Sequence, residues 1–197
     1  MFNFAASPEG LSSLSLPPGH SLICFSHLRW NFDFHRLQHL MSRFARNARV
    51  IYWEEPEEAT PECEPALGVR TCAETGVVVV TPSLPEPMKR TERDKALRTL
   101  LNDFLAAEEG PFIRWYCDPA MLLFSRHLAS AITIYDRAVA APGRLPGLER
   151  ELTNIADLVF AGETEDLGAR LAKLIRPPAP ANLNGPPILM TVEPQLG

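Results

Sequence analysis

The chain has 197 residues, of which 46% are hydrophobic and 22% are charged, and its formal net charge is −5. This balance predicts one globular domain, or two at most, and excludes a chain that is disordered throughout. An acidic chain also argues against non-specific binding of nucleic acid, which needs a basic face. No apolar run approaches the ~20 residues that cross a bilayer.

The ends of the chain differ in composition from its middle. The 19 prolines concentrate at the two ends and in the connections. We therefore predict flexible segments at 1–20 and 177–197 around one folded domain at 21–176. The first twenty residues have neither the basic region nor the apolar region of an export signal, so we expect a cytoplasmic protein.

The four cysteines show no CxxC spacing, which fits a reduced compartment. Cys24 and Cys117 lie in apolar runs and are predicted to be small core residues. Cys63 and Cys72 fall on a predicted loop, where a disulfide between them is the less favoured alternative.

Short apolar runs alternate with helical stripes along the folded part. The apolar runs predict about six strands, at 21–26, 49–53, 77–81, 112–117, 131–135 and 158–160. Helical spacing predicts helices at 33–46, from Thr91 onward, at 119–128, around 148–155 and at 164–175. Residues 54–75 are acidic and proline-rich, and we predict a loop there with a small hairpin around 67–72.

The predicted helices each carry an apolar face. In the first helix, one stripe comprises Leu37, Leu40, Met41 and Phe44, and the residues predicted to face away are Arg36, His39, Arg43 and Arg46. Later helices place Leu97, Leu100, Leu101, Phe104 and Leu105 on one face, and Leu148, Leu152 and Ile155 on another.

This alternation predicts an α/β fold, with an open, mostly parallel sheet and helices on both faces. Ligands of such sheets bind outside the carboxyl ends of the strands, near the topological switch point. The loops that meet there are 26–32, 54–58, 117–119, 136–143 and 161–164.

Several common site motifs are absent. The first loop has no glycine, so it lacks the GxGxxG pattern that binds NAD or FAD. The chain has no P-loop and no GxSxG elbow, and we predict no cofactor. His35 and His39 share a helical face, but no carboxylate accompanies them, and a site without metal is favoured.

The first loop nevertheless contains three side chains that are suited to ligand binding or catalysis. Arg29 offers donors for a phosphate or carboxylate, His27 an acid or base, and Trp30 a stacking face. The alternative is a loop that buries Trp30 in the core and points Arg29 into solvent. The residues alone do not separate these two interpretations.

Acidic side chains follow several predicted strands. Asp118, Asp136 and Glu163 each come directly after a strand and predict a cleft along one sheet edge, although Asp118 also suits a helix cap. An acidic cluster follows the second strand, where a carboxylate can hold a sugar hydroxyl but a solvated loop is more common. It comprises Glu54, Glu55, Glu57 and Glu58.

Basic residues gather at the start of the helix predicted from Thr91 onward, interleaved with Glu92 and Asp94. They are Lys89, Arg90, Arg93, Lys95 and Arg98. The pattern is typical of a solvated face, and docking to anionic lipid at a membrane surface is the weaker alternative.

Three stretches together carry a family resemblance. Residues 22–40, followed by 49–56, resemble the start of a group of bacterial GT-B glycosyltransferases, in which an FSHLRWDF…QRPQHL run precedes a strand ending in EEP. Residues 124–128 and 134–136 are similar to the SRHL…VYD region of that group. Residues 149–162 look like its ERELL..ADLVFTGG segment, in the same order and at similar spacing.

The resemblance covers the N-terminal half of such enzymes. It implies a Rossmann-like domain that receives the acceptor, whereas the C-terminal half of GT-B enzymes binds the nucleotide-sugar. It also implies a carbohydrate or cell-envelope acceptor, with Arg29 and Trp30 lining its cleft, Asp136 orienting hydroxyls and His27 in a catalytic or orienting role. The donor-binding half would then come from a separate protein.

The sequence also departs from the pattern of that group. The YDCMDE run is Tyr135 to Ala140 here, without its second acidic pair, and the second glycine of TGG is Glu163. Within QRPQHL, His35 and Leu37 replace the first glutamine and the proline. These changes keep a non-catalytic binding or scaffold module as the alternative function. A small α/β enzyme of another kind is a third candidate function, and no motif in the sequence supports it.

Overall fold

The computed structural model describes residue 16 and residues 18–31, 36–137 and 145–160, together with residues 170, 173 and 174. Its strands are β1 (Ser21–Phe25), β2 (Val50–Trp53), β3 (Glu57–Ala59), β4 (Ala66–Thr71), β5 (Val78–Pro85), β6 (Phe112–Tyr116), β7 (Ile132–Asp136) and β8 (Leu158–Phe160). Its helices are α1 (Arg36–Phe44), α2 (Arg90–Leu105), the 3-10 turn η1 (Pro119–Met121), α3 (Leu122–Ser125) and α4 (Pro146–Ile155).

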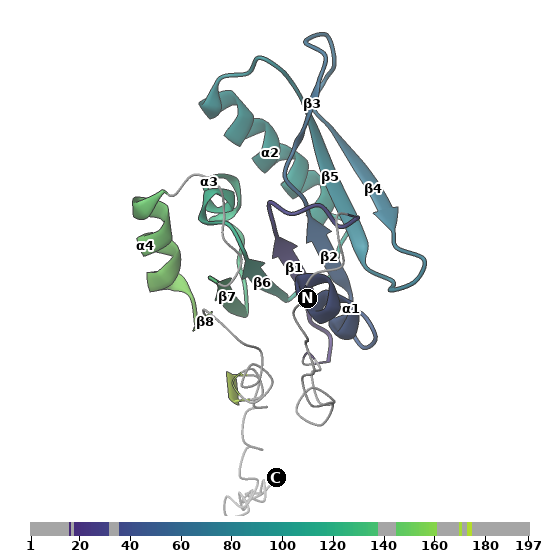
Figure 1. Cartoon of the computed structure of the whole chain (residues 1–197), viewed down its shortest axis with the longest axis vertical. Coiled ribbons are helices and arrows are strands. Elements are labelled where there is room, and N and C mark those ends of the chain that lie inside the picture. Colours follow the sequence, from purple (N-terminus) through teal and green to yellow (C-terminus); the bar gives the residue numbers. More distant parts are fainter. Residues whose placement is uncertain are drawn as a thin grey trace, which may run out of the picture.

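All of these strands belong to one sheet, and every pairing between them is parallel except that of β4 with β5. From β5 the order runs through β2, β1, β6 and β7 to β8, and β4 flanks β5 at the opposite edge (Figure 1). The predicted open, mostly parallel α/β sheet is confirmed.

β2 and β3 are two parts of one interrupted strand. Trp53 of β2 pairs with Val80 of β5, and Glu57 of β3 pairs with Ser83, so four steps along one strand match three along the other. This extra residue is a bulge, which turns side chains away from their regular alternation. Ser83 also pairs with Ala66 of β4, so β3 and β4 lie on opposite edges of β5.

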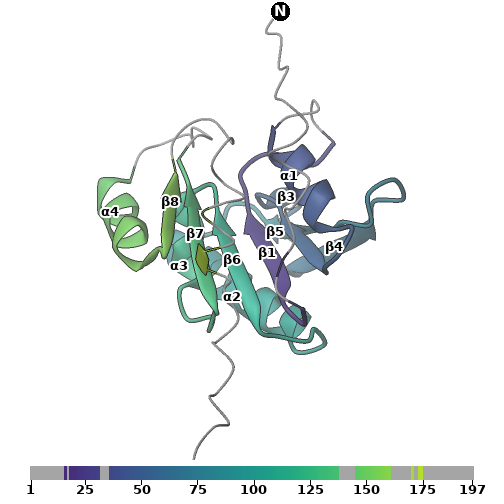
Figure 2. The ribbon, with the colours of Figure 1, turned by 90° about the horizontal axis from the view of Figure 1, so that it is seen from below.

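Helices cover both faces of the sheet, as predicted. α1 packs its apolar stripe on one face, and Leu37, Leu40, Met41 and Phe44 are all buried there. α2, α3 and α4 pack on the other face, which also holds Trp53 and Tyr116. Figure 2 shows α1 on one side of the sheet and α2 and α3 on the other. Cys24 and Cys117 are buried core thiols, as expected.

The expected number of strands was too low, because β3 and β4 fall in the predicted loop at 54–75. β4 lies at the sheet edge with most of its side chains exposed. It therefore lacks the alternation of apolar and polar residues by which a strand is recognised. The hairpin expected around 67–72 exists, but its second arm is β5.

Other boundaries also differ from the expectation. The helix predicted at 119–128 is η1 followed by the single turn of α3. Ile155, predicted to face the core, is 42% exposed at the end of α4. The helix predicted at 164–175 and most of the segments 1–20 and 177–197 lie outside the described residues. Among the helices that the structure describes, none is long and apolar enough to cross a membrane.

Candidate functional site

The topological switch point of the sheet lies between β1 and β6. The chain leaves β1 for β2 and β5 on one side and returns to β6 on the other side of β1. The loop at 26–31 leaves β1 here, next to Cys117 and Asp118 at the end of β6, because Phe25 pairs with Tyr116. The loop predicted to carry the site thus lies at the sheet edge where open α/β sheets generally bind ligands.

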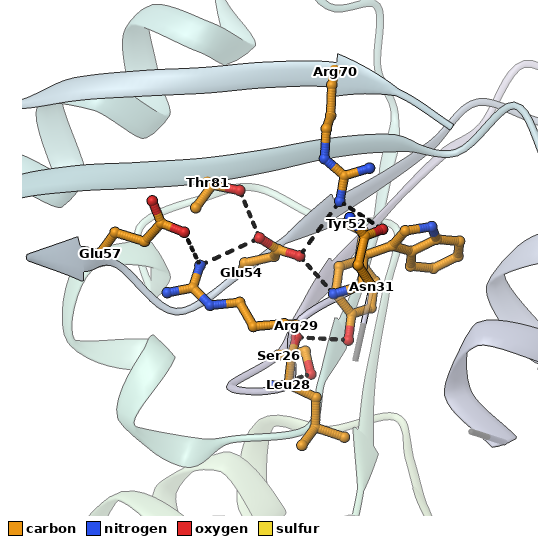
Figure 3. A network of polar contacts seen from close by, with 10 residues as sticks. Ser26, Leu28, Arg29, Asn31, Tyr52, Glu54, Glu57, Arg70 and Thr81 are labelled. Carbon is orange, nitrogen blue, oxygen red and sulfur yellow. Dashed lines mark hydrogen bonds and ion pairs between the residues drawn. The ribbon is translucent and has the colours of Figure 1, made fainter. Parts of the chain in front are cut away.

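Glu54, the first residue of the bulge, organises this edge (Figure 3). Its carboxylate is only 3% exposed and accepts hydrogen bonds from the Trp30 backbone N–H at 2.6 Å and from the Thr81 hydroxyl at 2.6 Å. The Arg29 guanidinium donates to it at 3.3 Å. Arg70 of β4 forms a longer ion pair at 4.0 Å. Glu54 therefore ties the 26–31 loop to β5 and β4.

Arg29 lies between two carboxylates. Its Nη1 is 3.3 Å from Glu54 and 3.5 Å from Glu57, and about a third of the side chain is exposed. The guanidinium is therefore neutralised within the protein. A ligand would meet only the donors that these two carboxylates leave unused.

Trp30 is buried in the core, which is one of the two interpretations that the sequence left open. Its side chain is 3% exposed and packs edge-on against Tyr52, with ring centroids 5.0 Å apart. The Gln38 side chain of α1 donates to the Trp30 carbonyl. Trp30 thus presents no open face on which a sugar could stack, and instead fixes the loop to the sheet and to α1.

His27 lies between two anchored neighbours. The Leu28 N–H donates to the Ser26 hydroxyl at 3.1 Å, and the Tyr52 hydroxyl donates to the Leu28 carbonyl at 3.0 Å. Burial raises the pKa of Tyr52, so its hydroxyl stays protonated as this donor. His27 is half-buried, and its Nδ1 meets no hydrogen-bond partner among the described residues. Because Nδ1 is itself buried, a ligand would have to reach the imidazole through the exposed part of its ring.

The two described acids at the ends of β6 and β7 have different roles. Asp118 caps η1, because its carboxylate accepts from the Ala120 N–H at 2.8 Å. Asp136 is fully buried and pairs with Arg36 of α1 at 2.5 Å. Arg36 was predicted to face away from the core, and that prediction was wrong. Glu163 lies outside the described residues, as does His35.

Sequence reasoning missed the organising role of Glu54. The signal was its place directly after a buried strand, since residues there reach the carboxyl edge of the sheet. Its three exposed neighbours, Glu55, Glu57 and Glu58, made the whole cluster look solvated. Within the described stretches 18–31, 36–137 and 145–160, no three His, Cys, Asp or Glu side chains gather as metal ligands.

No protein-family model and no curated protein matches the sequence. Among solved structures, the chain is similar to the trehalose-6-phosphate synthase of E. coli bound with UDP-2-fluoro glucose, with a TM-score of 0.45 and 14% identity over 78% of this chain. It is also similar to the UDP-forming alpha,alpha-trehalose-phosphate synthase of Burkholderia xenovorans in complex with glucose-6-phosphate, with a TM-score of 0.44 and 12% identity over 77% of this chain. The alignment covers 42% of each of those chains, which is less than half their length.

Proposed function

We propose that this chain is the acceptor-side half of a GT-B-type glycosyltransferase, acting on a carbohydrate acceptor with a nucleotide-sugar donor. The proposal rests on the sequence resemblance and on the way the structure joins its parts. Each resembling stretch supplies one member of a polar pair whose other member lies in another resembling stretch.

Arg29, from the FSHLRW-like run, contacts Glu54, from the EEP-like run, at 3.3 Å. Arg126, from the SRHL-like run, lies 3.3 Å from Glu151, in the ERELL-like segment. The Trp30 N–H, which donates to Glu54 at 2.6 Å, is the shortest link within the first pair of stretches. The resemblance is therefore carried by residues that meet in space, which is the observation that supports the proposal most directly.

His27 is the residue to which we assign the proton transfer. In glycosyl transfer, the oxygen of an acceptor hydroxyl attacks the anomeric carbon, the bond to the nucleotide diphosphate breaks, and the hydroxyl proton passes to a base. An imidazole is suited to that step near neutral pH. Glu54 positions the loop that carries His27. Asp118 and Arg29 offer the nearby polar atoms for orienting the acceptor.

The nucleotide-sugar would bind to the other half of such an enzyme. We therefore expect the chain alone to bind acceptor sugars without turning over nucleotide-sugars at even ~1 per second, a modest enzymatic rate. All four cysteines are free, which fits a reducing compartment such as the cytoplasm for this assembly.

A non-catalytic binding or scaffold module is the second candidate. One observation favours it: three of the side chains expected to meet a ligand are already engaged within the protein. Arg29 pairs with two glutamates, Trp30 is buried, and Asp136 is buried against Arg36. In this case the rigid loop would serve a protein partner instead of a sugar.

Saturation-transfer NMR with uncharged mono- and disaccharides and with UDP-sugars separates the two candidates. The proposal predicts carbohydrate signals for the wild type and a loss of about 1–3 kcal/mol of binding free energy in His27→Ala, the scale of one lost hydrogen bond to a charged or polar group. His20→Ala is the matched control, because His20 lies at the opposite end of β1. Absence of any carbohydrate signal, or equal binding by His27→Ala, would favour the scaffold module.

A further inference from the structure

Arg114 is a nearly buried cation in the middle of β6, away from the carboxyl edge of the sheet. Its side chain is 8% exposed and lies on the sheet face covered by α2 and α3, with its guanidinium 5.9 Å from the Tyr116 ring centroid. Nη2 donates to the Thr133 hydroxyl at 2.9 Å. Nη1 reaches the Arg126 carbonyl only at 3.5 Å, and Nε has no hydrogen-bond partner among the described residues.

None of the contacts of Arg114 is to an anion. Across the part of the chain that the structure describes, no carboxylate lies within 4.0 Å of this guanidinium. A buried charge that lacks a counter-ion is costly, and proteins normally pair it. Arg114 therefore has hydrogen-bonding capacity and charge that its protein neighbours leave unused.

Other polar groups converge on the same place. His127 follows the carbonyl that Nη1 contacts, and its Nε2 lies 2.6 Å from Asn102 of α2. Arg98 lies one helical turn before Asn102, on the same side of α2. Ser130 shares a 3.0 Å hydrogen bond with Thr133. Burial lowers the pKa of His127, and the positive charges of Arg98 and Arg114 lower it further.

The charge balance of this group is positive. Arg126, the remaining cation beside it, already pairs with Glu151 at 3.3 Å. Arg98 has no carboxylate within 4.0 Å among the described residues, as is the case for Arg114. Arg98 and His127 are exposed, so an ion from solvent can approach the group from their side.

We propose that Arg114, His127 and Arg98 form a binding site for an oxyanion of the phosphate class, on the face of the sheet opposite α1. The Arg114 fork supplies the buried donors, since a guanidinium matches two oxygens of such an anion. His127 and Arg98 close the site on the solvent side, and Ser130 supplies a hydroxyl. The site is independent of the His27 loop, which lies at the carboxyl edge.

The test is a titration of the full chain with inorganic phosphate, at ionic strength matched with sodium chloride. Binding is followed by the His127 ring signals in NMR, and by the unfolding temperature. Phosphate should shift the His127 signals and raise its pKa, because an adjacent anion favours the imidazolium. Arg114→Met should weaken phosphate binding at least ten-fold while keeping the buried stem, and Arg98→Gln should weaken it several-fold.

Arg46→Gln is the matched control, because Arg46 is exposed just after α1 on the other face of the sheet. A parallel titration with glycerol phosphate tells a free anion from a phosphate group carried by a small molecule, and a response to either supports the site. If Arg114→Met does not fold, Arg98→Gln and His127→Gln still test the proposal. It is overturned if neither probe changes the wild type beyond the chloride control, or if all variants bind as the wild type does.

Discussion

Two nearly buried charges, Glu54 and Arg114, differ in how fully neighbouring groups of the protein pair with them. Glu54 accepts from a backbone N–H, a hydroxyl and a guanidinium, and a second guanidinium lies at 4.0 Å. Arg114 has one good hydrogen bond to a hydroxyl, a long one to a carbonyl, and an unpaired Nε. Arg114 lies within β6, and Glu54 directly follows β2 of the same sheet.

This difference separates a buried charge that stabilises the fold from a buried charge that is available to a ligand. A buried ion whose lone pairs are all occupied holds several segments in place, and its removal releases them together. A buried ion that lacks a counter-charge contributes little to the fold. It is worth retaining only where something outside the fold uses it. Substitutions at the two positions should therefore differ in sign as well as in size.

The largest effect is expected at Glu54. Glu54→Ala leaves Thr81 and the Trp30 N–H without their acceptor and Arg29 with Glu57 alone, and should lower the free energy of unfolding by about 3 kcal/mol. Urea unfolding measures the loss. Glu55→Ala is the matched control, because Glu55 is exposed next to it, and should change stability by no more than about 0.5 kcal/mol. Equal effects at the two positions would contradict the role given to Glu54.

A smaller effect of opposite sign is expected at Arg114. In phosphate-free buffer, Arg114→Met should leave the free energy of unfolding unchanged or raise it by about 1 kcal/mol, because an apolar residue of similar volume replaces a charge with no counter-ion. The same urea assay measures it. A clear loss of stability would show that the present contacts of Arg114, to Thr133 and the Arg126 carbonyl, already compensate its charge.

The smallest effect concerns pH. Burial, Arg98 and Arg114 lower the pKa of His127 below its ordinary 6.5, against the Phe124 carbonyl, which raises it. The folded chain then binds fewer protons than the unfolded chain, so this group's contribution to stability is present above pH 6.5 and is lost as pH falls through the folded pKa. His127→Gln should flatten that shallow part of the stability profile. A profile that is unchanged by the substitution would contradict the shift.

The fold was largely readable from the sequence because its signals are local. Buried parallel strands such as Val50–Trp53 are unbroken apolar runs, and the α1 stripe repeats at helical spacing. The edge strand Ala66–Thr71 was missed as a strand because exposed residues carry no such pattern. Its existence depends on pairing with β5, which is a property of the assembled sheet.

The sequence predicted the location of the candidate site but not its detailed contacts. The loop after β1 could be located, since the carboxyl ends of parallel strands share one edge. The burial of Trp30 could not be decided, because it depends on Tyr52 from another strand. The pairing of Arg36 with Asp136 joins residues a hundred positions apart, and helical periodicity alone gave Arg36 the wrong direction.

The interruption between β2 and β3 also affects which part of the sheet opens locally. β3 and the outer half of β5 pair with each other beyond the bulge, and β4 lies exposed beside them. Segments with little buried surface open at lower free energy than the centre of a sheet. Because Glu54 stands at the bulge and holds the Trp30 N–H, local opening of this outer ribbon also releases the loop that carries His27. We therefore expect the loop and the ribbon to open together, and the Trp30 amide to exchange with solvent at a rate closer to that of Leu84 than to that of Ile23 in β1.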